Sequence, residues 1–377
     1  MINRTLVKNI QNKLFKGKTI VIVGARQVGK TTLIKTVLSG KDYLFLNGDD
    51  PYTRSILRNP STKELENIIG NSKIVFIDEA QRLENIGITA KIIHDQMQNV
   101  QLILSGSSAF ELKNKTNEAL TGRKFEYFLM PISYEELEQS TSFIDAASNL
   151  KNRLVFGMYP EIINHPGEEV VLLNELTQSY LYKDILALGS VQKPDVLEKI
   201  LRALAFQVGS EVSYNEVAQL VGVDKNTVAN YIHLLELSYV IFTLPSLSRN
   251  LRNEIKTNKK IYFYDNGVRN ALIQNFNPLE LRNDVGALWE NFLITERMKR
   301  NSYHQSFVNR YFWRTVQQQE IDYVEEQNGV IKGYEFKWNP KAKAKQPKAF
   351  IEAYQSSIET IHQENYRDFI VYPPSSK

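Results

Sequence analysis

The chain has 377 residues, more than one ordinary hydrophobic core accommodates, so we expect two or three domains. Its 42% hydrophobic and 23% charged residues are typical of a globular protein, and no apolar run approaches the length of a signal core or a membrane span. Cysteine is absent, which excludes disulfides and thiolate metal sites and fits a reducing compartment. We therefore expect a cytoplasmic protein with no membrane partner; the net charge of +4 does not select a partner.

Residues 20–33 are the most informative stretch of the chain. A run of β-branched residues leads into the pattern G-x-x-x-x-G-K-T and then into a helical pattern, which is the setting that a phosphate-binding P-loop requires. Glycines permit the backbone angles that turn the N–H groups of the loop onto a phosphate at the positive end of the helix. The residues predicted to bind the nucleotide are Gly24, Ala25, Arg26, Gln27, Val28, Gly29, Lys30, Thr31 and Thr32.

Two residues of this loop have their own predicted roles. Lys30 reaches the β- and γ-phosphates, and the Thr31 hydroxyl binds Mg²⁺. A glycine turn that only matches the pattern is the alternative. The strand, the spacing and the helix all agree with the first interpretation, so a nucleotide phosphate and Mg²⁺ are the predicted ligands.

Three more strands are predicted, over residues 43–47, 73–79 and 101–108. The second of them ends in Asp78 and Glu79, as a Walker B sequence does. Asp78 is predicted to hold Mg²⁺, and Glu79 to polarise the water that attacks the γ-phosphate. A solvated strand end is the alternative.

Two further places along the chain offer side chains that would contact the γ-phosphate. The strand that begins at residue 101 runs into Ser107 and Ser108, either of which would sense the γ-phosphate, unless these small residues only cap a helix. Arg123 would stabilise the charge developing on this phosphate, within the chain or across a subunit contact; a surface arginine is the alternative. Because strands alternate with helices, we predict a parallel sheet with the nucleotide at the carboxyl ends of its strands.

Residues 212–244 are predicted to form a helix-turn-helix followed by a strand, the pattern of a winged helix. Ser213 begins a capping box at the first helix, Gly222 ends that helix, and Asp224 caps the second. DNA is one predicted partner, because Lys225, Asn226, Thr227 and Asn230 would face the major groove. The alternative is a winged helix that only packs against the rest of the protein, since its second helix carries few cations.

The C-terminal third is predicted to contain a helix over residues 284–296 and then three strands, with Glu290 on the helix and Asp322 on the middle strand. Glu335 and Lys337 point to the same face of the last strand. The two strand carboxylates would hold Mg²⁺, while Lys337 steadies the attacking water or the phosphate charge. This order of residues resembles a restriction-endonuclease-like core. An ordinary ion-paired strand face and a nuclease-like fold that has lost its chemistry are the alternatives.

The sequence also resembles the prokaryotic AAA-type ATPases that carry a C-terminal domain of unknown function. The resemblance covers nearly the whole chain and is carried by residues 24–32, 76–81, 105–108, 120–123, 131–136, 157–161 and 182–185. It implies ATP as the ligand, and a homo-oligomer as one arrangement, because AAA-type ATPases often complete their sites between neighbours. Ala25 stands where the family more often has proline.

We therefore predict an α/β protein with three domains. These are a P-loop parallel-sheet ATPase domain (1–155), a helical winged-helix domain (156–250) and a nuclease-like α/β domain (251–377). The first functional hypothesis is an ATP-hydrolysing AAA-type ATPase that couples its nucleotide state to the C-terminal domain and acts on DNA. The second is an ATP-dependent switch or regulatory interaction protein with no nuclease activity.

Overall fold

The computed structural model describes residues 2–107, 116, 118–178, 193–248, 259–344 and 346–373. The chain forms two compact units. The first contains residues 1–131 and 237–239, and the second contains residues 132–236 and 240–377. Within the described residues, we find no helix with the length and hydrophobicity that a membrane crossing requires.

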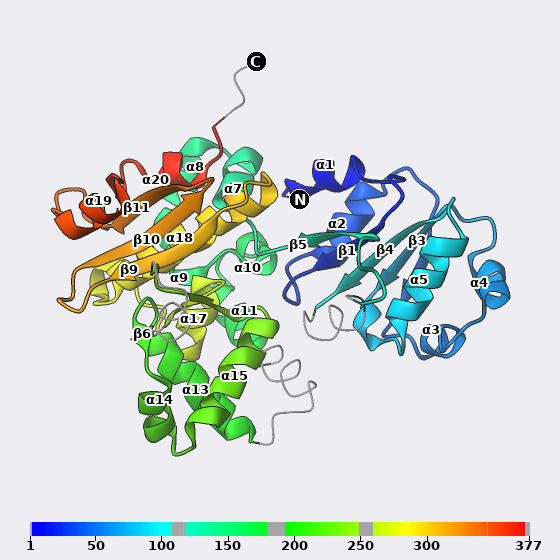
Figure 1. Cartoon of the computed structure of the whole chain (residues 1–377), viewed down its shortest axis with the longest axis horizontal. Coiled ribbons are helices and arrows are strands. Elements are labelled where there is room, and N and C mark those ends of the chain that lie inside the picture. Colours follow the sequence, from blue (N-terminus) through cyan, green and yellow to red (C-terminus); the bar gives the residue numbers. More distant parts are fainter. Residues whose placement is uncertain are drawn as a thin grey trace. The chain divides into compact units, whose positions relative to one another are not determined.

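The first unit is built on a five-stranded parallel sheet with the strand order β2-β3-β4-β1-β5 (Figure 1). The strands are Thr19–Val23 (β1), Leu44–Asn47 (β2), Ile74–Asp78 (β3), Gln101–Gly106 (β4) and Lys124–Phe128 (β5). β1, β3 and β4 are buried along their whole length, as expected for apolar strands covered on both faces. The predicted parallel sheet is confirmed, and β5 is a strand that the sequence analysis did not predict.

Helices connect these strands. They are Leu6–Gln11 (α1), Lys30–Val37 (α2), Pro51–Ile56 (α3), Thr62–Ile69 (α4) and Ile86–Gln96 (α5), with the short 3₁₀ helix Ala80–Arg82 (η1) directly after β3. Both α2 and α5 pack against β4. Because all five strands run in the same direction, β1, β3 and β4 end at one edge of the sheet, and α2 begins there.

The first part of the second unit is mainly helical. Its helices are Tyr134–Ser140 (α7), Phe143–Ser148 (α8), Leu150–Phe156 (α9), Pro160–Asn164 (α10), Glu169–Leu176 (α11), Pro194–Phe206 (α13), Tyr214–Val221 (α14), Lys225–Leu237 (α15) and Asn266–Leu272 (α17). Ser213 caps α14 and accepts the N–H of Glu216, which is one of the two bonds of the predicted capping box. Residues 182–185 of the family resemblance, like Ser108, lie outside the described residues.

A three-stranded antiparallel sheet accompanies these helices. It consists of Glu211–Val212 (β6), Ile241–Leu244 (β7) and Lys259–Phe263 (β8), in the order β6-β8-β7. α14 and α15 begin and end as the sequence predicted, and β7 follows them. The winged-helix assignment and its contact with DNA stay predictions.

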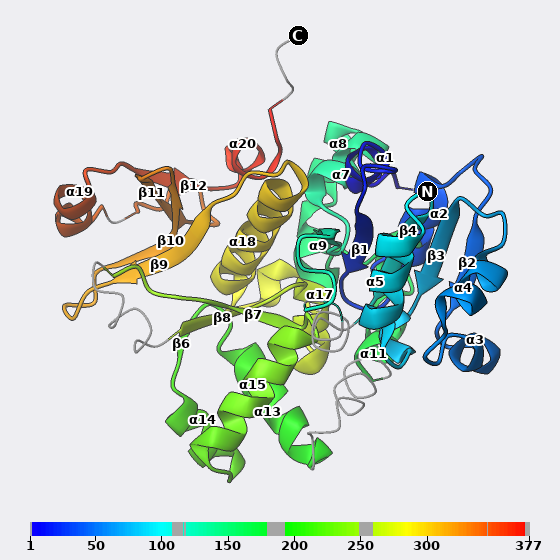
Figure 2. The same ribbon diagram turned by 45° about the vertical axis from the view of Figure 1, so that its right-hand side comes forward.

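The last part of the chain forms a four-stranded sheet in the order β12-β11-β10-β9. Its elements are Leu279–Leu281 (η3), Val285–Tyr303 (α18), Asn309–Arg314 (β9), Glu320–Gln327 (β10), Val330–Phe336 (β11), Lys348–Tyr354 (α19), Ile358–Ile361 (β12) and Tyr366–Ile370 (α20). β12 is parallel to β11, and the other pairs are antiparallel. The long helix α18 lies beside this sheet and contacts β11 (Figure 2). The predicted helical middle and C-terminal sheet are therefore both present.

The division between the units differs from the first predicted domain boundary, which was placed at residue 155. Residues 132–155 lie in the second unit, where buried polar contacts hold them. Glu296 on α18 accepts the N–H of Tyr134 at 2.6 Å, and Lys299 donates to the carbonyl of Ile132 at 3.0 Å. Contacts between residues so distant in sequence leave no local pattern. The three-domain division itself stays a prediction.

Candidate functional site

The phosphate loop joins β1 to α2 at the edge where the parallel strands end. Gly29, which caps α2, has a left-handed φ of 94°, and a Cβ atom at Gly24 would collide with the carbonyl oxygen of Leu129. The ammonium of Lys30 lies inside the loop and donates to the carbonyls of Gly24 at 2.9 Å and Ala25 at 2.8 Å. The loop thus places a lysine at the N-terminus of a helix, which suits a phosphate group.

Thr31 and Asp78 lie side by side although they are 47 residues apart. The Thr31 hydroxyl donates to Oδ2 of Asp78 at 2.6 Å. The other oxygen of Asp78 accepts the Ser105 hydroxyl and, at 3.1 Å, the N–H of Glu79. A hydroxyl and a carboxylate held together offer the oxygen ligands that Mg²⁺ prefers. These residues therefore fit the predicted metal.

Glu79 directly follows β3 and adopts a left-handed φ of 48°, which is uncommon for a residue other than glycine. Its Oε2 accepts Nε2 of Gln81 at 2.6 Å and lies 3.3 Å from the Ser107 hydroxyl. Gln81 also donates to Ser107 at 3.1 Å. The structure thus brings Glu79 and Ser107 together, and their roles at the γ-phosphate stay predictions. Gln81 is an unpredicted third member, and the sequence signal for it is its place in segment 76–81, which carries the family resemblance.

Two more residues that the sequence analysis missed support this edge. Arg4 donates to the carbonyl of Val28 in the phosphate loop at 2.9 Å and to that of Met130 at 2.6 Å. Gly48 packs so closely that a Cβ atom would collide with the carbonyl oxygen of Glu79. Both residues make these contacts only in the assembled sheet, so no local sequence motif indicates either of them.

The structure does not bring Arg123 to this edge. Arg123 precedes β5, and its carbonyl accepts the N–H of Thr19, the first residue of β1, at 2.9 Å. It therefore lies where the parallel strands begin, and its Nε donates to Asp95 at 2.8 Å. The expected in-chain role at the γ-phosphate is corrected on this ground. A role across a subunit contact stays a prediction.

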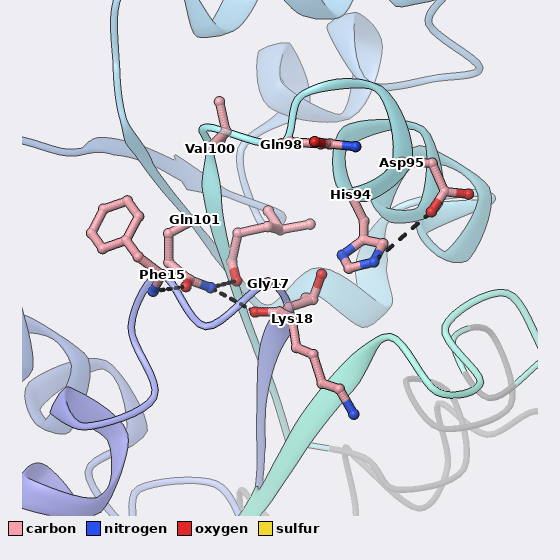
Figure 3. A pocket seen from close by; sticks show the side chains of 10 residues that line it. Phe15, Gly17, Lys18, His94, Asp95, Gln98, Val100 and Gln101 are labelled. Carbon is pink, nitrogen blue, oxygen red and sulfur yellow. Dashed lines mark hydrogen bonds and ion pairs between the residues drawn. The ribbon is translucent and has the colours of Figure 1, made fainter.

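A cavity of about 490 Å³ also lies at the edge where the strands begin (Figure 3). Its lining residues are Phe15, Gly17, Lys18, Thr19, His94, Asp95, Gln98, Val100, Gln101 and Leu102. The Gln101 side chain accepts the N–H of Phe15 at 2.6 Å and donates to the carbonyl of Lys18 at 3.0 Å. None of these lining residues belongs to the predicted nucleotide site, so the cavity is separate from it.

The four predicted residues of the C-terminal third form one cluster. The Lys337 ammonium donates to Oε2 of Glu335 at 3.0 Å and lies 3.9 Å from Oδ2 of Asp322. Glu290 on α18 contacts Lys260, which also contacts Glu320 on β10, the strand that carries Asp322. The structure thus places the four predicted residues on neighbouring elements, and their chemical role stays a prediction.

Three further residues complete the cluster, namely Lys260 and Tyr262 on β8 and Glu320 on β10. Lys260, whose side chain is 3% exposed, places Nζ 3.2 Å from Oε1 of Glu290 and 2.6 Å from Oε1 of Glu320. The Tyr262 hydroxyl donates to the same oxygen of Glu290 at 2.6 Å. Because β8 belongs to another sheet, no spacing in the sequence indicates these contacts.

Burial and neighbouring charges shift the pKa values of the ionisable side chains in this cluster. Burial and the charge of Asp322 raise the pKa of Glu290 to about 7, although Lys260 acts in the opposite direction. Burial and Asp322 also raise the pKa of Glu335 to about 7. Burial opposes the charged form of Lys260, but the charges of Glu290, Asp322 and Glu320 outweigh it and raise the pKa of this lysine.

We expect Glu290→Gln to change how stability depends on pH. The pKa of Glu290 rises from 4.5 to about 7 on folding, so the folded state holds a proton that the unfolded state releases, and stability falls as pH rises through this window. The stability of Glu290→Gln relative to the wild type should therefore increase by roughly 3 kcal/mol between about pH 4 and about pH 8.

Urea unfolding followed by tryptophan fluorescence measures this difference, because all three tryptophans lie in the second unit. Glu352→Gln, at an exposed position on α19, serves as the control. Parallel pH profiles for the wild type and Glu290→Gln would contradict the raised pKa.

As it stands, the C-terminal cluster does not fit a divalent metal. Within the described part of the chain, no three Asp, Glu or His side chains are grouped so that they could hold a metal ion. Asp322 uses Oδ2 to accept the N–H of Phe336 at 2.8 Å, and Lys260 lies between Glu290 and Glu320. The predicted Mg²⁺ at Asp322 and Glu335 is therefore not supported by this geometry.

Comparison with known proteins assigns the first unit. Residues 16–138, which contain the phosphate loop, Asp78, Glu79 and Ser107, match a family model described as an AAA domain. The first unit has the P-loop fold of AAA-type ATPases. The fold is similar to that of the Walker-type ATPase of Pyrococcus abyssi, with a TM-score of 0.52 and 15% identity over 72% of this chain and 96% of that chain.

The remainder of the chain matches two models described as domains of unknown function, DUF8612 over residues 147–279 and DUF4143 over residues 285–374. An uncharacterized protein of Mycobacterium tuberculosis is 24% identical over 340 residues, which cover 89% of this chain and 73% of that protein. An uncharacterized protein of Haemophilus influenzae is 25% identical over 280 residues, covering 67% and 68%. The restriction-endonuclease-like assignment stays a prediction.

Proposed function

We propose that the AAA-type P-loop domain of this protein hydrolyses ATP with Mg²⁺ as its cofactor. The observation that carries the proposal is the 2.6 Å contact between the Thr31 hydroxyl and Asp78, next to the lysine of the phosphate loop. It joins the Walker A and Walker B segments at the edge of a parallel sheet where nucleotides bind.

Each side chain of this edge has a separate task in the proposed reaction. Lys30 and the loop N–H groups would bind the β- and γ-phosphates, and Thr31 with Asp78 would hold the metal ion. Mg²⁺, when bound, neutralises part of the phosphate charge. Glu79 orients the attacking water, while Gln81 and Ser107 fix its carboxylate through their bonds to Oε2.

Phosphate release by the purified chain tests this proposal. We expect turnover that requires Mg²⁺ and that falls by about 100-fold or more in Asp78→Asn, because the metal loses a charged ligand. Asp42→Asn, at an exposed position just before β2, is the matched control. Turnover that is independent of Mg²⁺, or equal in Asp78→Asn and the wild type, would contradict the proposed role.

We further propose that nucleotide state regulates the second unit, which acts as an interaction module and does not cleave nucleic acid. The position of Lys260 between two carboxylates of the cluster supports this over cleavage. DNA is the first partner to test, through α15, and the AAA-type domain gives a homo-oligomer as the arrangement to test.

Cleavage of nucleic acid by the second unit is the competing function. The convergence of Asp322, Glu335 and Lys337 favours it. Metal-dependent cutting of DNA or RNA that is lost in Lys337→Ala and kept in Lys332→Ala, an exposed lysine on β11, would replace the interaction module with a nuclease.

A further inference from the structure

Lys260 links two sheets of the second unit. It lies on β8 in the three-stranded sheet, whereas its carboxylate partners lie on α18 and on β10 of the four-stranded sheet. Its side chain is 3% exposed. A buried ammonium is unfavourable unless charged partners compensate for the water it has lost, and here the contacts at 2.6 and 3.2 Å supply them.

The charge of the cluster explains why a cation is required. Two charged groups, Lys260 with Glu290 and Glu320 and Lys337 with Glu335 and Asp322, meet along β10, which carries both Glu320 and Asp322. Lys337 contacts Glu335 and approaches Asp322, so it serves one half of the cluster. Glu290 and Glu320 would face each other without an intervening positive charge if Lys260 were absent.

We propose that Lys260 is the resident cation of this cluster, with its ammonium occupying the place that a divalent metal would take between Glu290 and Glu320. Mg²⁺ requires oxygen ligands at about 2.1 Å in octahedral geometry. An ion bound between these two carboxylates would overlap with Nζ of Lys260. The second unit therefore assembles its acidic residues without metal, and a metal site opens only when the lysine is removed.

Terbium luminescence separates this cluster from the phosphate loop. Tb³⁺ is a hard cation that binds oxygen ligands as Ca²⁺ and Mg²⁺ do, and it emits when a nearby tryptophan is excited. Trp289 precedes Glu290 and Trp338 follows Lys337, and their rings lie 5.2 Å apart. No tryptophan belongs to the first unit, because the three in the chain are residues 289, 313 and 338.

The experiment titrates Tb³⁺ into the nucleotide-free full chain and into three variants. Lys260→Met removes the charge but keeps the length of the side chain, and Lys260→Arg keeps the charge. Lys259→Met changes the neighbouring lysine, which points to the other face of β8. Each titration is repeated with Asp78→Asn, which disables the predicted metal site of the phosphate loop.

We expect Lys260→Met to gain one saturable Tb³⁺ site that the wild type lacks, since one positive charge has left the cluster. Excess Mg²⁺ should suppress the signal, whereas the wild type, Lys260→Arg and Lys259→Met should show no saturable emission. These results should be the same with Asp78→Asn, so they do not depend on ATP hydrolysis.

Equal saturable emission from the wild type and Lys260→Met would overturn the proposal, as would a Lys260→Met chain with wild-type circular dichroism that binds no metal. If Lys260→Met does not fold, thermal unfolding of the wild type decides. An unchanged unfolding temperature in millimolar Mg²⁺ supports a resident ammonium. A temperature that Mg²⁺ raises, and that Asp322→Asn returns to its metal-free value, excludes it.

Discussion

Glu79→Gln should reduce ATP turnover by about 10²–10⁴-fold, which is the range for loss of a positioned general base. Glutamine keeps the shape of the side chain and its contacts with Gln81 and Ser107, but it does not draw a proton from the attacking water. Affinity for Mg·ATP should change little, because Lys30, Thr31 and Asp78 are intact. Steady-state phosphate release and equilibrium binding of ATP, measured together, give the two quantities.

Glu84→Gln is the control for this substitution, since Glu84 lies five residues further along and pairs only at the surface with Arg58. It should hydrolyse ATP at the wild-type rate. Gln81→Ala should show an intermediate loss, because the carboxylate of Glu79 then loses one of its donors. Wild-type turnover by Glu79→Gln would show that another group activates the water.

Glu296→Ala should destabilise the second unit by about 3–5 kcal/mol, the range for removal of one partner from a buried ion pair. Glu296 and Lys299 are 2.6 Å apart and have side chains that are 1% and 2% exposed. Alanine would leave the ammonium of Lys299 buried without its carboxylate and the N–H of Tyr134 without its acceptor. Urea unfolding monitored by tryptophan fluorescence measures the loss in this unit.

Glu352→Ala is the matched control, because this exposed glutamate lies on α19 of the same unit. Its stability should stay within about 0.5 kcal/mol of the wild type. If Glu296→Ala is equally stable, the pair with Lys299 does not hold residues 132–134 to α18, and the observed boundary between the units needs another cause.

The nucleotide edge was largely predictable from the sequence because its signals are local. The loop between β1 and α2 is a continuous pattern of glycines, lysine and threonine, and Asp78 with Glu79 ends an apolar strand. Parallel strands then bring these two segments together. In the C-terminal third, alternation along β11 and the order of acidic residues likewise indicated that Glu335 and Lys337 would meet Asp322.

Residues whose positions depend on tertiary structure were not predictable from the sequence. Arg123 belongs to segment 120–123, one of those that carry the family resemblance. The pairing of β5 with β1 nevertheless places it where the parallel strands begin. Lys260 lies on a different sheet from its partners, so no spacing relates it to Glu290. Residues 132–155 were predicted to continue the first domain, because their buried polar contacts with α18 leave no periodic signal in the sequence.

Calorimetric titration of Mg·ATP into the wild type and Lys30→Ala tests directly whether the loop between β1 and α2 binds a nucleotide. We expect one Mg·ATP bound per chain and an affinity at least about tenfold weaker in Lys30→Ala, because a charge-assisted contact with the phosphates is lost. Lys35→Ala, an exposed lysine on the same helix, should bind as the wild type does. Failure of the wild type to bind Mg·ATP, or equal binding by Lys30→Ala, would contradict a nucleotide site in this loop.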